Sequence, residues 1–368
     1  MPVSFLDLKR QYSEIETEIN SALSRVLTGG QYVLGREVEA FEREWARFCG
    51  VAAAAGVNSG TDALALALVA SGAVRRGFQD EVITSPLTAG YTALAIKSAG
   101  GVPVFADIDP QTYTLDPDSI ERAVNARTRA VVPVHLYGQM ADMEAIKRVA
   151  ERHGLIVVED AAQAHGAQRA GGRAGAHGHA AAFSFYPTKN LGAYGDGGAV
   201  TSNDVELVER VRVLRQGGHP EALSQKAVGA NSRLDELQAA VLRVKLGHLE
   251  RWNSIRRELA EEYQTFFDRR SGILAPSASE PGAHVFHLYV VQHAERERLI
   301  AHLERRGIQT MIHYPELLHR QPLFRSSAGG SLRVAESVVG KILSLPFHPH
   351  LSRAELQELK DALHAFPA

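Results

Sequence analysis

One lysine of the chain has neighbours that suit covalent chemistry. Lys189 lies in FSFYPTKNLGAYGDGG (183–198), where aromatic residues precede it and four glycines follow it. The chain has only 8 lysines against 32 arginines, so Lys189 does not belong to a charged surface run. Aromatic surroundings favour the neutral amine, which attacks carbonyl groups, and glycines let a bulky ligand approach closely. A surface lysine with a solvated ammonium group is the alternative that these residues leave open.

A carboxylate ends an earlier apolar run. Asp160 is the last residue of LIVVED (155–160), and in α/β sheets ligands bind outside the carboxyl ends of the strands. A charge placed there needs a positive partner, which the protonated ring nitrogen of a cofactor would supply. Gln163 follows closely and would offer its amide to the same cavity. A helix N-cap is the competing interpretation of Asp160.

A small polar turn opens a predicted helix in VNSGTDALALAL (57–68). Free backbone N–H groups at this turn, residues 58–62, would bind a phosphate at the positive end of the helix dipole. An N-cap by Ser59 or Thr61 explains the same residues without a ligand. Taken together, phosphate donors, a carboxylate for a pyridinium nitrogen and a lysine for a Schiff base are what pyridoxal 5′-phosphate requires. We therefore expect this cofactor.

Other common chemistries lack their motifs. The chain contains no GxxxxGK[ST] loop, GxGxxG fingerprint, GxSxG elbow or HExxH pair. His177 and His179 have no third ligand nearby and Cys49 is the only cysteine, so we expect neither a metal site nor a disulfide. A net charge of −2, a pI of about 6.8 and the lack of a long apolar run predict a cytoplasmic protein that binds neither nucleic acid nor membranes.

Short β-rich apolar runs alternate with helix-like stretches over much of the chain. The predicted strands are 81–86, 102–108, 129–136, 155–160 and 181–186, and the clearest predicted helices between them are 89–100 and 142–154. This alternation predicts an α/β fold with a mostly parallel, doubly wound sheet.

The pattern changes near residue 235. A long helical stretch over 235–270 places five apolar residues near one face: Leu237, Val241, Val244, Leu249 and Trp252. A predicted strand (284–291), helix (295–307) and strand (308–314) follow, with two more helical stretches after them. We therefore predict a large cofactor-binding domain over 1–240 and a small C-terminal α/β domain over 241–368 that includes the connecting helix.

The chain resembles the DegT/DnrJ/EryC1/StrS sugar aminotransferases, which are fold-type-I pyridoxal-phosphate enzymes with the architecture of aspartate aminotransferase. The resemblance extends over nearly the whole chain and rests on the order of several segments. These are GGQYVLGREVEAFEREWARFCG (29–50), NSGTDALALAL, GGVPVFADID (100–109), PVHLYGQMADMEAI (133–146), VVEDAAQAHGA (157–167), FSFYPTKNLGAYGDGGAV (183–200), NSRLDELQAAVL (231–242) and IHYPELLHRQP (312–322).

The resemblance implies roles around the cofactor. Lys189 would form the Schiff base and carry the proton between the cofactor and the substrate carbon, and Asp160 would keep the pyridine nitrogen protonated. Gln163 would lie near the phenolic oxygen of the cofactor. The residues that would hold the phosphate are Gly60, Thr61 and Ser184.

The resemblance also implies roles between subunits and at the substrate. Asn231 of NSR would reach the phosphate of the neighbouring subunit, so we expect a homodimer with shared active sites. Arg233 would lie beside it, and Tyr314 would lie close to the substrate. One position departs from the family, because Ala89 replaces the aromatic residue that usually stacks on the cofactor ring. We predict that Tyr91 supplies that ring instead.

The implied reaction is transamination. L-glutamate, or glutamine, would donate the amino group, and a keto-sugar linked to dTDP or UDP would accept it. The segment FYPTKNLGAYGDGG (185–198) is more similar to members that aminate C3 of the hexose than to those that aminate C4. A 4-aminotransferase and a keto-cyclitol aminotransferase remain alternatives. A sugar dehydratase, which carries histidine in place of the lysine, and a non-catalytic regulator are less favoured.

Overall fold

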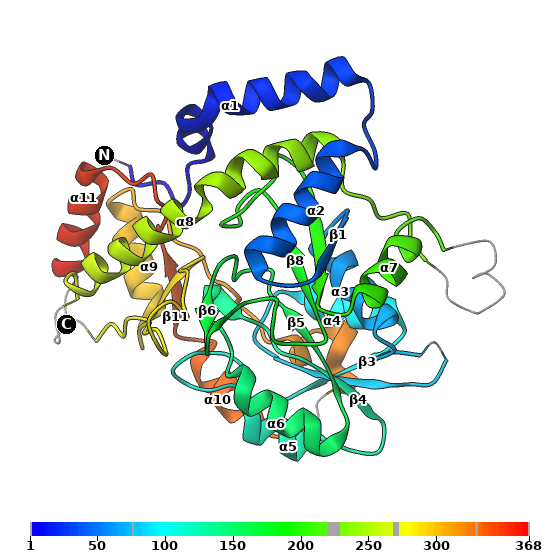
Figure 1. Cartoon of the computed structure of the whole chain (residues 1–368). Helices are drawn as coiled ribbons and strands as arrows, with labels where there is room; N and C mark the ends of the chain where they lie inside the picture. The colour runs from blue at the N-terminus through cyan, green and yellow to red at the C-terminus, as the bar shows by residue number, and fades with distance from the viewer. Residues whose placement is uncertain (1, 76, 219–228, 268–271, 328–329, 367–368) are drawn as a thin grey trace.

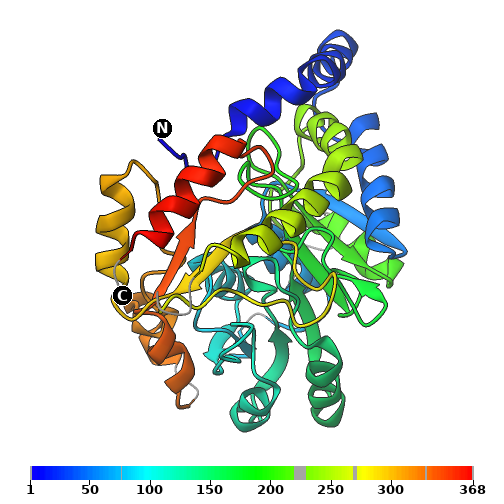
Figure 2. The same cartoon turned by 90° about the vertical axis from the view of Figure 1, so that its left-hand side faces the viewer.

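A mixed sheet forms the centre of the chain in the computed structural model, which describes residues 2–75, 77–218, 229–267, 272–327 and 330–366 (Figures 1 and 2). The sheet has seven strands in the order β1-β9-β8-β5-β4-β2-β3. Its pairs are parallel except those that involve β9. The strands are β1 (Ala53–Val57), β2 (Glu81–Thr84), β3 (Val102–Phe105), β4 (Thr128–Val132), β5 (Ile156–Asp160), β8 (Ala180–Ser184) and β9 (Gly198–Ser202).

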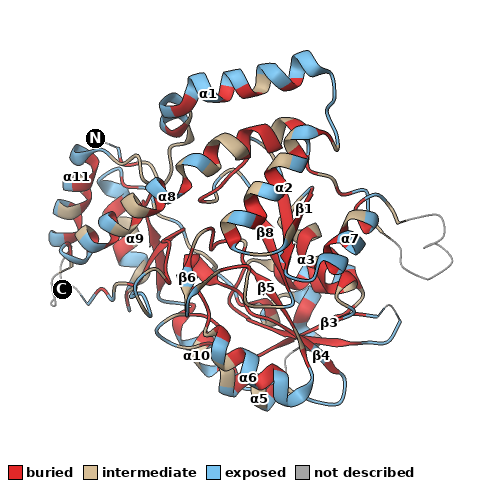
Figure 3. Ribbon diagram, in the orientation of Figure 1, coloured by how far each residue is buried: buried red, intermediate tan, exposed pale blue. Residues whose placement is uncertain are grey.

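Helices cover both faces of this sheet. One layer contains α3 (Gly60–Ala70), α4 (Gly90–Ala99) and α7 (Val205–Leu214), and the other contains α2 (Arg36–Cys49), α5 (Pro117–Ala123) and α6 (Met143–His153). Adjacent strand residues serve different layers: Val157 of β5 packs in the α2 layer and Val158 in the α3 layer. The sheet and the inner sides of the helices are therefore buried, as Figure 3 shows, and the predicted doubly wound fold is confirmed.

The five predicted strands are all present, as β2, β3, β4, β5 and β8, each somewhat shorter than the apolar run that predicts it. Strands β1 and β9 were not predicted. Their sequences are AAAGV and GAVTS, and alanine and glycine have low strand propensity. Burial between two helical layers, rather than local preference, makes these segments strands.

The long predicted helix is α8 (Glu236–Gln264), which crosses the molecule beneath α1 (Leu8–Gly29) in Figure 1. Val241 and Trp252 are buried against Ile15 and Ile19 of α1. Leu249 is buried on the sheet side, whereas Leu237 and Val244 are partly buried. Among the described helices even α8, the longest, lacks the apolar stretch that crossing a lipid bilayer requires.

The C-terminal part differs from the prediction in its second strand. Residues 308–314 form only single bridges, at Ile308 and Met311, because this segment turns back toward the sheet domain. The strand that pairs with β10 (Tyr289–Gln292) is instead β11 (Ile342–Leu345), and the pair is antiparallel. The predicted helix 295–307 is present as α9 (Arg296–Arg305).

The remaining elements are short or lie near the C-terminus. They are β6 (Gln168–Arg169), β7 (Gly172–Arg173), the 3₁₀ helices η1 (Leu136–Gly138), η4 (Leu318–Arg320) and η5 (Pro322–Ser327), and the helices α10 (Arg333–Val338) and α11 (Arg353–His364). Helices α9 and α11 pack with β10, β11 and the end of α8 in a separate apolar cluster. The domain boundary at 240/241 stays a prediction.

Glu236, the first residue of α8, caps another helix. Helix α2 begins after Gly35, which has no side chain to cap it. The Glu236 carboxylate accepts hydrogen bonds from the backbone N–H groups of Gly35 (2.8 Å), Glu37 (2.9 Å) and Val38 (2.9 Å), and the residue is only 3% exposed. Three of the N–H groups that a helix start leaves unpaired are thereby satisfied.

We expect Glu236→Gln to lower the free energy of unfolding by about 1.5–3 kcal/mol, because the amide loses the charge and turns an NH₂ group toward an N–H donor. Urea denaturation monitored by circular dichroism measures the change. Glu261→Gln, on an exposed position of the same helix, is the control and should be neutral. Equal stabilities of the two variants would contradict the capping role.

Candidate active site

Asp160 lies at the carboxyl end of β5 and is 8% exposed. Thr92 Oγ1 donates a hydrogen bond to its Oδ2 (2.7 Å), and the N–H of Ala162 donates to Oδ1 (3.2 Å). Residues 161–167 form turns rather than a helix, so the N-cap interpretation of Asp160 is wrong. The carboxylate is fixed by a neutral hydroxyl and a backbone amide, at the sheet edge where α/β proteins bind ligands.

Lys189 lies in the loop 185–197 that follows β8, where its N–H bonds to the carbonyl of Tyr186 (2.9 Å). The residue as a whole is partly exposed, but its amine is desolvated, and this burial lowers the pKa of Lys189 to about 8. The negative charge of Asp160 opposes that shift in the pKa of Lys189. This electrostatic interaction indicates that the two side chains belong to one site. A desolvated amine of this kind does not fit the surface-lysine interpretation.

Two buried histidines, His165 and His287, and the partly buried His313 lie near the lysine and were not predicted. Burial lowers the pKa of His165 to about 3 and that of His313 to about 4, and it lowers the pKa of His287 well below the usual value. The charge of Lys189 adds to each shift. All three imidazoles are therefore neutral near pH 7 and add no positive charge around the amine.

The polar turn of residues 58–62, called the phosphate turn, contacts both ends of the loop that carries Lys189, called the lysine loop. Ser59 Oγ caps α3 by accepting from the N–H of Asp62 (3.1 Å), so the predicted N-cap is present and the N–H groups of Gly60 and Thr61 remain for a ligand. A Cβ added at Gly60 would lie 2.5 Å from Ser184 Cβ, which brings the predicted phosphate-binding residues together.

Two glycines after Lys189 have a different purpose from the expected one. A Cβ at Gly198 would lie 2.3 Å from the carbonyl oxygen of Ser59, and one at Gly192 would lie 2.4 Å from that of Pro187. These glycines let backbone segments of the protein approach one another. The prediction was that they would let a ligand approach.

Gln163 connects the sheet edge to the C-terminal part. Its Oε1 accepts from the N–H of Tyr137 (2.7 Å), and its Nε2 donates to Tyr314 OH (3.0 Å). Burial raises the pKa of Tyr314 to about 12; the hydrogen bond from Gln163 opposes the shift and the charge of Asp160 adds to it. Tyr314 is therefore a neutral phenol beside Asp160 at physiological pH.

The NSR segment contacts the phosphate turn of its own chain through a residue that was not predicted. Buried Ser232 accepts from the N–H of Asn58 (3.1 Å) and donates to Asp62 (2.7 Å). Its neighbour Asn231 is exposed and Arg233 is partly buried. The role of Asn231 in a neighbouring subunit stays a prediction, and the position of Ser232 between these two residues is the signal that could have identified it.

Tyr91, near the start of α4, is 67% exposed. The next residue, Thr92, is buried and is the one that contacts Asp160. Thr88 and Thr92 are four residues apart and lie 3.2 Å from each other through their hydroxyl oxygens. Thr88 precedes α4, which begins at Gly90, so the pair spans the start of the helix, and no local pattern in the sequence marks Thr92. Stacking by Tyr91 stays a prediction.

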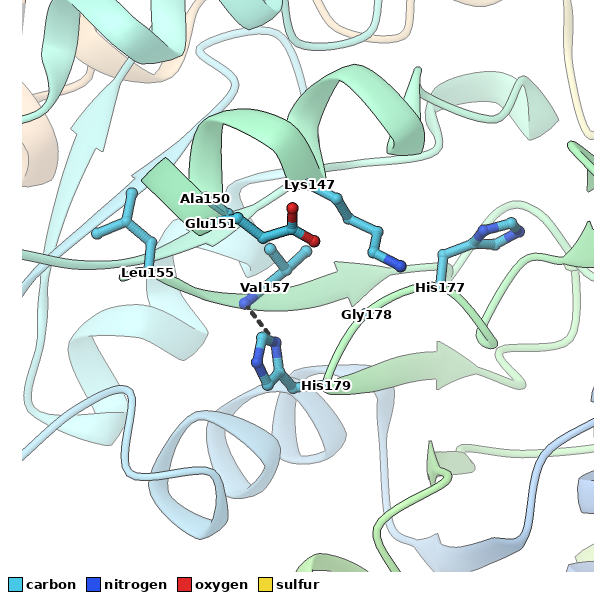
Figure 4. A pocket seen from close by; sticks show the side chains of 8 residues that line it. All are labelled: Lys147, Ala150, Glu151, Leu155, Val157, His177, Gly178 and His179. Atoms are coloured by element: carbon cyan, nitrogen blue, oxygen red, sulfur yellow. Dashed lines mark hydrogen bonds between the residues drawn. The ribbon is translucent and has the colours of Figure 1, made fainter. Parts of the chain in front are cut away.

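A hollow, called the second hollow to distinguish it from the candidate active site, lies at the end of β5 opposite Asp160. It has a volume of about 290 Å³, and its polar lining comes from Lys147, Glu151, His177 and His179 (Figure 4). The N–H of Val157, near the start of β5, donates to His179 Nδ1 (3.1 Å). Asp160 is at the other end of this strand, so the hollow is separate from the candidate active site.

We expect the Lys189 amine of the cofactor-free protein to react with acetic anhydride with a pH midpoint near 8, because burial keeps it neutral at a lower pH than an ordinary lysine. Mass spectrometry of the digested protein measures the labelling at each pH, with the exposed Lys97 as the internal reference. A Lys189 midpoint at or above that of Lys97 would contradict the desolvated site.

Known proteins are similar to this chain in sequence and fold. The chain is 48% identical over 363 residues to dTDP-3-amino-3,4,6-trideoxy-alpha-D-glucose transaminase of Streptomyces venezuelae, covering 98% of this chain and 95% of that protein. It is also 48% identical over 355 residues to the erythromycin biosynthesis sensory transduction protein EryC1 of Saccharopolyspora erythraea, covering 96% of each.

A crystal structure of DesV from S. venezuelae in complex with a ketimine intermediate superposes with a TM-score of 0.93 at 48% identity, covering 98% of this chain and 97% of that chain. The sequence pattern of one aminotransferase family matches residues 13–364. The resemblance inferred from the motifs is thus confirmed, and the chain belongs to the DegT/DnrJ/EryC1/StrS aminotransferase family of pyridoxal 5′-phosphate enzymes.

Proposed function

We propose that the protein transfers an amino group from L-glutamate to C3 of a dTDP- or UDP-linked 3-keto-(6-deoxy)hexose, with pyridoxal 5′-phosphate as cofactor. The observation that carries the proposal is the desolvated Lys189 amine, which is affected by the charge of Asp160 and lies in the loop that follows Ser184, the residue against Gly60. Support for the C3 position comes from the relative named as a 3-amino-sugar transaminase, which is 48% identical.

The residues at the site fit this cofactor. The start of α3 presents N–H groups at Gly60 and Thr61 to a phosphate, and Ser184 lies against Gly60. Asp160 accepts only two hydrogen bonds from described residues, so its carboxylate retains lone pairs for a protonated ring nitrogen. When bound, the cofactor supplies an aldehyde that condenses with amines and a ring that accepts electrons.

The side chains divide the proton handling between them. Asp160, oriented by Thr92, holds a proton at the ring nitrogen. Lys189, neutral for a substantial fraction of the time at physiological pH, removes a proton from the substrate carbon and returns it. Gln163 holds Tyr314 at the edge of the site, where the neutral phenol donates or accepts a hydrogen bond toward the substrate without adding charge.

The proposal extends to a homodimer. Exposed Asn231 lies beside Ser232, which is fixed to the phosphate turn, so Asn231 is presented at the surface close to the site. We propose that it reaches the phosphate bound by the partner subunit, that Arg233 contacts the substrate diphosphate, and that Tyr91 stacks on the cofactor ring.

Non-catalytic regulation is the second candidate function, because one relative at 48% identity is named as a sensory transduction protein. Lys189 and Asp160 are both intact and share one site, which favours catalysis. A sugar dehydratase is disfavoured because that reaction employs histidine at the lysine position. The colour of the purified protein distinguishes the aminotransferase from the non-catalytic regulator. An aminotransferase purified with its cofactor is yellow, and borohydride traps the cofactor on Lys189.

The acceptor is identified by loading the protein with pyridoxamine phosphate and adding 3-keto nucleotide sugars, 4-keto nucleotide sugars and keto-cyclitols separately. We expect only a 3-keto nucleotide sugar to restore the aldehyde absorbance. Restoration by a 4-keto sugar or a cyclitol alone would refute the C3 assignment, and a colourless protein that binds no cofactor would refute the enzyme assignment.

We expect Lys189→Ala to bind the cofactor yet to lose turnover by at least roughly 10²-fold, because the base that moves the proton is gone. Single-turnover kinetics with L-glutamate measure this loss. Lys147→Ala changes a lysine at the second hollow and should retain wild-type rates. Turnover by Lys189→Ala at the wild-type rate would remove the assigned role.

We expect mixed dimers of Lys189→Ala and Asn231→Ala subunits to regain activity at limiting cofactor. If Asn231 serves the partner's phosphate, one of the two sites in such a dimer has both an intact lysine and an intact asparagine. Activity assays after co-expression with two affinity tags test this, and wild type paired with the double variant is the control. No recovery, or a fully active monomer in solution, would refute the shared site.

A further inference from the structure

The loop that carries Lys189 lies along one side of α8, the long helix in Figure 1. Three polar side chains of α8 contact it: Gln238, Lys245 and Asn253. They are seven and eight residues apart, so they lie on one stripe of the helix. Their partners are Tyr194, Gly192 and Asn190, at every second position of the loop and in the opposite direction. We call Gln238, Lys245 and Asn253 the α8 stripe.

Lys245 is the central member of the α8 stripe and is 0% exposed. Its Nζ donates to the carbonyl of Gly192 (2.8 Å) and lies 4.1 Å from the centroid of the Tyr194 ring. No carboxylate of the described residues pairs with it, and burial lowers the pKa of Lys245 to about 7. Burying an amine without a carboxylate partner is costly, so its contacts to the loop are the compensation that the structure offers.

The two outer members hold the loop at its ends. Asn190, the neighbour of Lys189, donates through Nδ2 to Asn253 Oδ1 (2.9 Å) and to the carbonyl of Val285 (3.0 Å). Asn253 in turn donates to the carbonyl of His165 (2.8 Å). At the other end, Gln238 Oε1 accepts from the N–H of Tyr194 (2.8 Å). Asn190 and Asn253 are buried, so each of their bonds is shielded from water.

The loop has little regular structure of its own to keep its shape. Residues 185–197 form neither helix nor strand. Within the loop, the N–H of Lys189 donates to the carbonyl of Tyr186 and that of Ala193 donates to the carbonyl of Phe185 (2.7 Å). The N–H of Phe185 donates to the carbonyl of Gly197 (2.7 Å) and joins the two ends of the loop. Gly192, where the loop backbone approaches Pro187 closely, supplies the carbonyl that accepts the hydrogen bond from Lys245. External contacts must therefore fix where the Lys189 side chain begins.

We propose that the α8 stripe positions Lys189, with Lys245 as the central positioning residue. Lys245 is a positioning residue and touches neither substrate nor cofactor. It acts by holding the backbone of Gly192, while Asn253 holds Asn190 beside the reactive lysine. The inference rests on the proposed function in one respect, since it takes Lys189 to be the lysine that binds the cofactor.

Lys245→Met tests the proposal, because methionine keeps an unbranched apolar stem and removes the amine. The matched control is Tyr263→Phe, on the same helix, which loses a buried hydrogen bond to the carbonyl of Pro346 (2.6 Å) without contacting the loop. Hydrogen exchange of the loop peptide is measured in the cofactor-free protein. The pH midpoint of the cofactor absorbance and the rates of the glutamate half-reaction are measured in the loaded protein.

For Lys245→Met we expect loop amides to exchange about tenfold faster or more, which matches the loss of one buried hydrogen bond. The absorbance midpoint should shift by about half a pH unit or more, and kcat should fall while KM changes little. Tyr263→Phe should change none of the three. Exchange and absorbance midpoint equal to wild type in Lys245→Met would overturn the proposal.

Two further results keep the test decisive. If Lys245→Met does not fold, Gln238→Ala takes its place, and unchanged exchange of the Tyr194 peptide in that variant overturns the proposal. If the wild-type protein binds no cofactor, the proposed function fails, and the exchange measurement on cofactor-free protein still decides whether the α8 stripe orders the loop.

Discussion

The desolvation of the Lys189 amine is the constraint on which the site depends. Removing the amine from water favours its neutral, nucleophilic form, but the nearby carboxylate of Asp160 favours the charged form. The structure balances the two effects, and the result is a lowered pKa rather than a fixed charge state. The surrounding His165, His287 and His313 are kept neutral by their own burial, so they do not compete with Lys189 for that carboxylate.

The sheet places these groups by register. Asp160 of β5 pairs with Ala182 of β8, so the lysine loop leaves β8 at the same edge at which Asp160 ends β5. The chain then returns through β9, antiparallel to β8, and this brings Gly198 against the backbone of Ser59. A slip of one residue in β5 would turn the Asp160 side chain to the other face of the sheet.

The sequence could predict the parts of the fold that local pattern determines. Runs of valine, isoleucine and phenylalanine identify five strands, and the lysine, the aspartate and the polar turn are recognisable because each has unusual neighbours. Segment 308–314 has a strand-like composition, yet it forms only a single bridge to β11, through Met311, before Tyr314 reaches the site, and β11 is the strand that pairs with β10. Strands β1 and β9 consist mostly of small residues, so only burial between helical layers defines them.

The missed site residues have a common cause. Thr92, Ser232 and Lys245 act on partners that are 68, 170 and 53 positions away in the chain. No local window contains both members of such a pair. Each residue type is also common in ordinary helices and turns, so the partner of each residue becomes known only from the folded structure.

Glu236 gives α8 a wider significance than its contacts with the loop. Glu236, at the N-terminus of this helix, caps the N-terminus of α2. The middle of α8 lies against the lysine loop, and its C-terminal end lies in the C-terminal apolar cluster. Movement of α8 away from the loop would therefore be opposed by contacts in three separate regions, which couples these regions through one helix. In such an arrangement the loop is ordered before any ligand arrives, and the entropy of ordering it is lost during folding rather than during binding.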